Sequence, residues 1–238
     1  MRRFLWLPVI IAIGLFACPR ETRAVGQSED DGSWTSEFGV EEEELSATGR
    51  NPYFILEPGY QLVFESKRER LVITVLDETK TVAGVETRVV EERETKDGKL
   101  VEISRNFFAI SKRTNSVFYF GEEVEILKDG KVVGREGEWL AGEKGATFGL
   151  IMPGLVLLRA RHYQEIAPKV AMDRAEIVSM SATVKTPAGE FKNCLKVEET
   201  TPLEPGEKEY KYYARGIGLL QDGSLKLVRY GKAEKRES

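Results

Sequence analysis

Residues 84–110, GVETRVVEERETKDGKLVEISRNFFAI, decide the fold. Two runs rich in β-branched and aromatic residues, 84–94 and 100–110, flank the dipeptide Asp97-Gly98. Such runs are typical of β-strands, and Asp-Gly supplies the two left-handed positions of a type I′ hairpin turn. The stretch therefore predicts an antiparallel β-hairpin.

The same signals recur from Tyr53 onward. Strands are expected at 61–66, 70–76, 84–94, 100–110, 117–120, 124–127, 131–139, 155–164, 175–185, 190–199, 207–214, 218–220 and 224–230. Asp129-Gly130 and Asp222-Gly223 predict two further type I′ turns. Because the connections are too short for crossover helices, successive strands should pair antiparallel in a meander.

The hydrophobic pattern indicates that this sheet is curved. In 190–199 the residues Phe191, Leu195 and Val197 share one face, whereas 71–76 (LVITVL) is apolar on both faces. A flat sheet with one solvated face does not need the second kind of strand, but a curled sheet does. The fold class is therefore predicted to be all-β, with a single strongly curved antiparallel sheet that forms a half-barrel or barrel.

The N-terminus has the pattern of an export signal. Met1-Arg2-Arg3 precedes the apolar run 4–16, which a small residue and a cysteine, Ala17-Cys18, follow directly. As a helix, this run would span about 20 Å, short of the roughly 30 Å hydrocarbon core of a bilayer. Leu15-Phe16-Ala17-Cys18 also resembles a bacterial lipobox, which implies cleavage before Cys18 and acylation of its thiol. An ordinary secretory signal is the alternative, and both imply export.

The chain is expected to have four parts. Residues 1–17 form the lipoprotein signal peptide, and 18–48 form a lipid-anchored acidic tether that is too polar to offset its ordering entropy and is therefore disordered. Residues 49–231 form the antiparallel β domain, and 232–238 form a charged tail. Within the tether, Trp34 and Phe38 are the only hints of a short contact.

Composition excludes several function classes. The formal net charge of −4 argues against nucleic-acid binding. One His and two Cys leave almost no ligands for zinc, copper or haem, so neither a metal site nor a cofactor is expected.

No catalytic residue is assigned. His162 lies between Arg161 and the Tyr163-Gln164 pair and is expected on a strand surface, and Cys194 is expected to be a buried or half-buried structural thiol. The carboxylates Glu122, Glu123, Glu125, Glu136 and Glu138 are expected on a solvated face. Tyr210 and Tyr212 share a strand phase and are expected to pack in the core, with their hydroxyl groups at its rim.

Residues 146–158, ATFGLIMPGLVLL, are unusually apolar for a loop. They are expected either to plug one end of the barrel or to form the mobile lip of a cavity for a lipid or hydrophobic ligand. The candidate lip residues are Phe148, Leu150, Ile151, Met152 and Leu155.

Two C-terminal segments carry a family resemblance. Residues 187–196 (PAGEFKNCLK) and 211–220 (KYYARGIGLL) resemble a strand pair shared by poorly characterised exported and lipid-anchored bacterial β-proteins, and Asn51-Pro52-Tyr53-Phe54 with Glu57-Pro58-Gly59 resembles their domain opening. The resemblance implies no catalytic residues. At the fold level such proteins are similar to the half-barrels that carry lipoproteins across the periplasm (LolA/LolB-like).

Together these features predict a cell-envelope lipoprotein, held at a membrane by acylated Cys18 and facing the periplasm or the exterior. Its expected role is non-enzymatic binding of an apolar ligand or lipid, or of an envelope protein, in the concave face of the sheet. The alternative is a scaffold or assembly lipoprotein whose sheet surface binds another envelope protein. An enzymatic role, through His162 and Cys194, is the least favoured.

Overall fold

The computed structural model describes residues 34–233. The expected signal peptide and Cys18 lie outside the described residues, as does most of the charged tail. The elements are η1 (Glu42–Glu44), β1 (Leu45–Ser46), β2 (Gly49–Asn51), β3 (Phe54–Leu56), β4 (Tyr60–Glu65), β5 (Glu69–Val82), β6 (Val85–Lys96), β7 (Lys99–Ser111), β8 (Val117–Lys128), β9 (Lys131–Gly134), β10 (Trp139–Leu140), β11 (Thr147–Met152), β12 (Arg161–Tyr163), β13 (Glu165–Ile166), β14 (Arg174–Thr186), β15 (Gly189–Thr200), β16 (Glu209–Ala214), β17 (Gly218–Asp222) and β18 (Leu225–Lys232).

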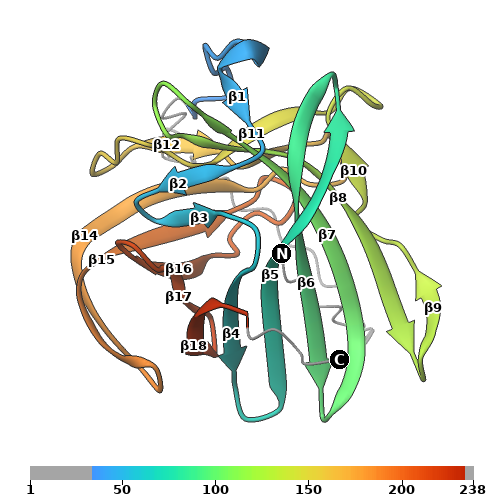
Figure 1. Ribbon diagram of the computed structural model, residues 1–238, viewed down its shortest axis with the longest axis vertical. Coiled ribbons are helices and arrows are strands. Elements are labelled where there is room, and N and C mark those ends of the chain that lie inside the picture. Colours follow the sequence, from blue (N-terminus) through green and yellow to red (C-terminus); the bar gives the residue numbers. More distant parts are fainter. Residues whose placement is uncertain (1–33, 234–238) are drawn as a thin grey trace, which may run out of the picture. The chain divides into compact units, whose positions relative to one another are not determined.

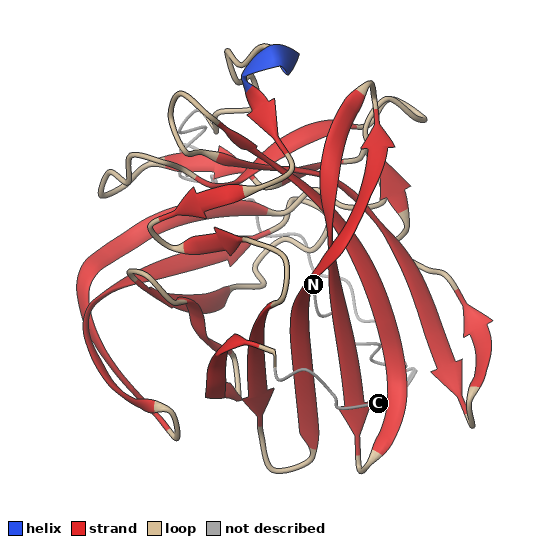
Figure 2. Cartoon of the chain, viewed as in Figure 1, coloured by secondary structure: helices blue, strands red, loops and turns tan. Residues whose placement is uncertain are grey.

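One large antiparallel sheet dominates the domain (Figure 2). Its strands follow the order β12-β14-β15-β16-β17-β18-β4-β5-β6-β7-β8-β11-β13. Neighbours along β14–β18 and along β4–β8 are consecutive in the chain, and β18 joins these two runs by pairing with β4. The predicted all-β fold and antiparallel meander are therefore confirmed.

A short segment nearly closes this sheet into a barrel (Figure 1). β12 pairs with β14 at one edge of the sheet, through Arg161–Tyr163. β13 follows directly and pairs with β11 at the other edge, where Phe148 lies opposite Glu165. Residues 161–166 therefore connect the two edges, and His162, Gln164 and Glu165 are buried there.

Two of the three Asp-Gly turns form as predicted. Both residues are left-handed in Asp97-Gly98 (φ 50° and 78°) and in Asp129-Gly130 (φ 51° and 76°). At the third turn Asp222 is the last residue of β17 and pairs with Leu225, so only Gly223, with φ 53°, is left-handed. The type I′ prediction is wrong there because the turn begins one residue later.

Two predicted strands are also corrected. The stretch 131–139 is divided into β9 and β10 by a turn at Gly137, whose φ is 99°. The stretch 155–164 is a loop up to Ala160, because Pro153-Gly154 ends β11 and Arg159 is left-handed (φ 69°); only 161–163 forms a strand.

The barrel interior has an apolar wall and a polar wall. Directly paired residues of neighbouring strands share a face of the sheet. Phe64 is fully buried between Leu227 and Leu71, its partners on β18 and β5, and these make the apolar wall. On the polar wall Asn106 of β7 lies opposite Glu122 of β8.

Residues 34–48, expected in the disordered tether, instead contact the barrel. The indole of Trp34 lies 4.4 Å from the Arg174 guanidinium, and the Phe38 ring lies 5.8 Å from that of Phe118. Leu45–Ser46 then pairs with β7. Residues 34–233 accordingly belong to one compact unit that contains every described strand. Residues 34–48 are therefore not part of a disordered tether, and Trp34 and Phe38, where the sequence hinted at a short contact, pack against the barrel. Residues 34–233 contain no helix of the length and hydropathy needed to cross a bilayer.

Candidate functional site

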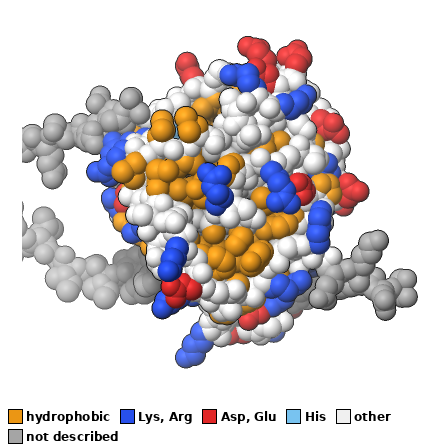
Figure 3. All heavy atoms as spheres, turned by 60° about the vertical axis from the view of Figure 1, so that its left-hand side comes forward, with side chains coloured by type: hydrophobic (Ala, Val, Ile, Leu, Met, Phe, Trp, Pro, Cys, Tyr) orange, Lys and Arg blue, Asp and Glu red, His pale blue; other side chains and the backbone are white. Residues whose placement is uncertain are grey.

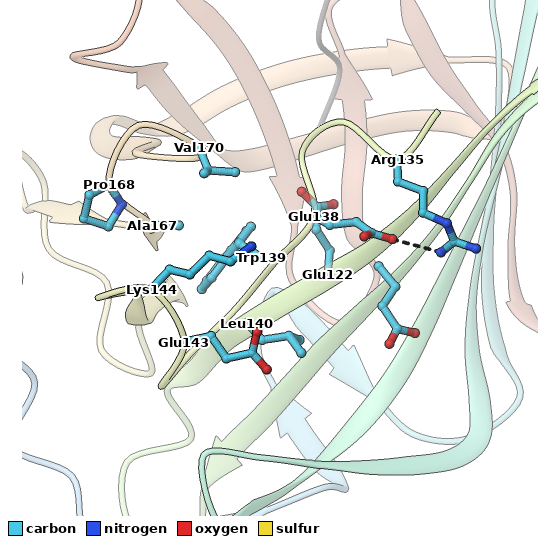
Figure 4. Close-up of a pocket in the computed structure, with 12 residues that line it drawn as sticks. Glu122, Arg135, Glu138, Trp139, Leu140, Glu143, Lys144, Ala167, Pro168 and Val170 are labelled. Atoms are coloured by element: carbon cyan, nitrogen blue, oxygen red, sulfur yellow. Dashed lines mark hydrogen bonds and ion pairs between the residues drawn. The ribbon is translucent and has the colours of Figure 1, made fainter. Parts of the chain in front are cut away.

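A pocket of about 250 Å³ lies between strands β8 and β10 and the turn around Pro168 (Figure 4). Trp139 forms one wall, and Leu140, Ala146, Pro168 and Val170 supply further apolar surface. The pocket also contains carboxylates, of which Glu122 is the most deeply buried, at 7% exposure. The site is thus amphipathic rather than purely apolar.

A glycine brings Glu122 and Trp139 together. Gly121 has φ 129°, a conformation that side chains disfavour, and it lies opposite Leu140 while Glu122 lies opposite Trp139. A Cβ atom at position 121 would lie 2.2 Å from the Trp139 carbonyl oxygen. Only glycine therefore lets β10 approach β8 closely enough for the indole and the Glu122 side chain to share the pocket.

Half of the charged residues that line the pocket form ion pairs. Arg135 contacts Glu138 at 3.1 Å and Glu125 at 3.5 Å, and Lys80 forms an ion pair with Glu123. These carboxylates are partly exposed, as expected for the solvated face predicted for Glu123, Glu125 and Glu138.

Glu122 differs from these carboxylates because it is buried, so the solvated-face prediction is wrong for it. Within residues 34–233 no Lys or Arg nitrogen lies within 4 Å of its carboxyl group. Burial raises the pKa of Glu122, and the neighbouring carboxylates Glu92 and Glu102 raise it further. A cation that reached this carboxyl would stabilise its ionised form.

Two buried polar atoms, one on the pocket residue Trp139 and one on Glu165 of β13, lack hydrogen-bond partners among the described residues. Trp139 Nε1 is buried and donates no hydrogen bond to the described residues. Glu165 Oε1 on β13 is also buried and accepts no hydrogen bond from them. Burial raises the pKa of Glu165 well above its usual range, and Asp173 and Glu122 add to this effect. Because buried polar atoms are normally hydrogen-bonded, these atoms are candidates for contact with a bound molecule.

The buried lysine of the barrel interior, Lys211, forms an ion pair with a carboxylate other than Glu122. Lys211 Nζ lies 2.6 Å from Glu199 Oε2 on the neighbouring β15. Burial alone would lower the pKa of Lys211, but Glu199 and Asp222 outweigh burial and raise it. Lys211 therefore neutralises its own neighbours rather than Glu122.

The inward position of Lys211 shows that the prediction for Tyr210 and Tyr212 is wrong. Lys211 and Tyr213 are the inward-facing residues of β16, whereas Tyr210 is exposed and stacks 3.7 Å from the Lys196 ammonium group. The expected core position of Tyr210 and Tyr212 is wrong. Lys211, whose side chain points to the other face of β16, takes the inward position because the buried carboxylates stabilise its charge.

His162 and Cys194 are not brought together. They pair with Ala175 and Ala182 of β14, seven residues apart, or roughly 23 Å along a strand. His162 is buried rather than on a strand surface, because β12 closes the barrel; burial lowers its pKa to about 4. Cys194 is a fully buried free thiol whose pKa burial raises, which confirms the structural position predicted for it.

The five predicted lip residues lie on or next to β11, and none of them lines the pocket. Phe148 stacks on Phe120 at 5.0 Å, Ile151 and Met152 are buried, Leu150 is half-buried, and Leu155 is exposed.

Glu122 and Trp139 were not predicted from the sequence to form a site. Gly121 inside an apparent strand was the available signal, because such a glycine often marks a bulge that reverses which side chains point inward. In the described part of the chain, no three His, Cys, Asp or Glu side chains are grouped so that they could hold a metal ion. No protein-family model matches the chain, and comparisons with curated proteins and with solved structures also give no match.

Proposed function

We propose that this protein is a cell-envelope lipoprotein, anchored through acylated Cys18, whose barrel binds a small ligand without catalysing a reaction. The ligand that suits the pocket carries a positively charged amine and a short apolar body. One observation carries this proposal: the buried residue Glu122, whose carboxyl has no Lys or Arg nitrogen within 4 Å among the described residues, lines the same pocket as Trp139, whose indole N–H has no partner there.

The ligand class follows from charge and surface. An ammonium group would form a charge-assisted hydrogen bond with Glu122, worth about 1.5–3 kcal/mol. The Trp139 ring would favour the same cation through its π face, and Leu140, Ala146 and Val170 would contact a hydrocarbon chain. The purely apolar ligand expected from the sequence would leave Trp139 Nε1 without a hydrogen-bond partner and Glu122 without a counter-ion.

The size of the ligand follows from the volume of the pocket. At about 250 Å³ the pocket is slightly smaller than the roughly 300–1,000 Å³ typical of ligand pockets, so it suits a small ligand. Hexylammonium, with a six-carbon chain and one nitrogen, is a suitable probe, and hexanol is its neutral counterpart.

A fluorescence titration tests the proposal. The chain 33–238 contains every described strand, and Trp34→Phe leaves Trp139 as its only tryptophan. We expect hexylammonium to change the Trp139 emission saturably, and hexanol to bind more weakly.

Glu122→Gln should weaken hexylammonium binding at least tenfold, about 1.4 kcal/mol. Glu143→Gln is the matched control, because Glu143 is an exposed carboxylate on the rim of the same pocket, and it should change affinity less than twofold. Equal affinity for hexanol, or equal losses in the two variants, would contradict the proposal.

A further inference from the structure

The polar wall of the barrel carries a second carboxylate near Glu122. The wall is formed by β6, β7 and β8, which lie side by side (Figure 1). Glu92 of β6 lies opposite Ser104, and Glu122 of β8 lies opposite Asn106, the next residue on the same face of β7. Because paired residues share a face of the sheet, both glutamates face the interior. With about 4.8 Å between strands and 3.4 Å per residue, their Cα atoms are about 12 Å apart.

Solvent reaches the interior beside Glu92. Ser104 and Asn106 are buried, whereas Glu92 is only half-buried although it faces inward. Glu102, on the same face of β7, is also half-buried, and its carboxyl group already accepts a hydrogen bond from Ser104 at 3.0 Å. Part of the interior along β7 is therefore open, and a flexible chain bound at Glu122 can extend toward Glu92.

The cations of the polar wall do not neutralise Glu92. Within residues 34–233 no Lys or Arg nitrogen lies within 4 Å of its carboxyl group. The inward-facing cations of β6 lie at the two ends of the strand. Arg88 Nε donates to the Ala47 carbonyl at 2.9 Å, and Lys96 Nζ lies 3.7 Å from Glu69. Glu92 thus resembles Glu122 in having no basic partner there.

The two carboxylates are spaced for separate positive charges. They lie on either side of β7, and in the described part of the chain no three acidic, His or Cys side chains are grouped around a common metal position. The charge of Glu92 raises the pKa of Glu122, so a cation beside Glu92 would also favour the ionised form of Glu122.

The outer surface at the left of Figure 1 has a different character. Figure 3 shows this face, where hydrophobic side chains gather in patches with Lys and Arg side chains between them. The carboxylates that would attract a small cation are thus inside the barrel rather than on this face.

We infer that the ligand of the pocket is a short diamine. One ammonium group binds Glu122, the hydrocarbon chain extends along the inward face of β7, and the second ammonium group binds Glu92. This inference rests on the proposed function, because it adds a second charge to the amine that Glu122 would bind. It assigns Glu92, which does not line the pocket, to the recognition of the far end of the ligand.

Two amines of equal chain length test this inference. Hexane-1,6-diammonium and hexylammonium differ only in the second ammonium group. In calorimetric titrations of the chain 33–238 at pH 7.5, we expect the diammonium to bind at least fivefold more tightly. Glu92→Gln should abolish this preference by weakening only the diammonium. Its hexylammonium affinity should change less than threefold, which would also show that the variant is folded.

Glu91→Gln is the matched control. Glu91 is the next residue on the same strand, but it lies on the outer face, opposite Thr74, and contacts Arg93 at 3.6 Å. This variant should keep the full preference for the diammonium.

The outcomes separate this inference from the proposed function. If hexylammonium binds the parent as tightly as the diammonium does, the inference alone is overturned. It is also overturned if Glu92→Gln keeps the preference, or if Glu91→Gln loses it equally. If neither amine binds, the proposed function and the inference fail together.

Discussion

Replacement of the only histidine tests how the barrel is closed. His162 is buried on β12, and burial lowers its pKa from 6.5 to about 4. The unfolded chain therefore takes up a proton as the pH falls below about 6.5, whereas the folded protein leaves His162 neutral until about pH 4. The contribution of His162 to stability is present above pH 6.5 and is lost as the pH falls toward 4. At pH 5 the loss is about 2 kcal/mol of unfolding free energy.

Urea unfolding of the chain 33–238 and of His162→Gln, at pH 7.5 and at pH 5, isolates this effect. Other titrating groups are common to both proteins, so the difference between their unfolding free energies should shrink by about 2 kcal/mol at the lower pH. In a tag-free chain the single imidazole also gives one set of ring-proton NMR signals, which should not titrate above pH 5. A stability difference that is the same at both pH values, or an imidazole that titrates near 6.5, would refute burial of His162 in the closing segment.

Three further outcomes follow from the fold. Lys211→Met should cost about 3–5 kcal/mol, because it leaves Glu199 buried without a cation, and the double variant with Glu199→Gln should recover part of the loss in urea unfolding. Gly121→Ala should lower the unfolding free energy by roughly 2–4 kcal/mol, because the new Cβ atom would clash with the Trp139 carbonyl. Gly130→Ala should lower it less, because the space around its Cβ atom is open. Cys18→Ser should move the full-length protein out of the membrane fraction of cells, and unchanged membrane association would contradict the proposed anchor.

Local signals were sufficient to predict the hairpins. Asp97-Gly98 and Asp129-Gly130 form their turns from their own backbone preferences, and the strands on either side must then pair antiparallel. Curvature was predictable because some strands are apolar on both faces. These features depend on residues that are close in the sequence.

The inward-facing polar residues were not predictable in this way. The orientation of Glu122 depends on the bulge at Gly121, and that of His162 depends on which strands flank residues 161–166. Lys211 points inward because Glu199 of the neighbouring strand stabilises it there. In each case the deciding partner lies on another strand, and pairing register is not visible in a single sequence.

The proposed role of Glu122 as the counter-ion of a cationic ligand is tested most directly by measuring how many protons the protein releases when the ligand binds. Because burial raises the pKa of Glu122, a bound ammonium group should drive proton release from it, and affinity should increase with pH. Calorimetric titration of hexylammonium at a series of pH values from 4.5 upward, each in two buffers of different ionisation enthalpy, measures that release. The parent should release protons on binding, and Glu122→Gln should release far fewer. Binding without proton release in the parent, or with the same release in Glu122→Gln, would contradict the account.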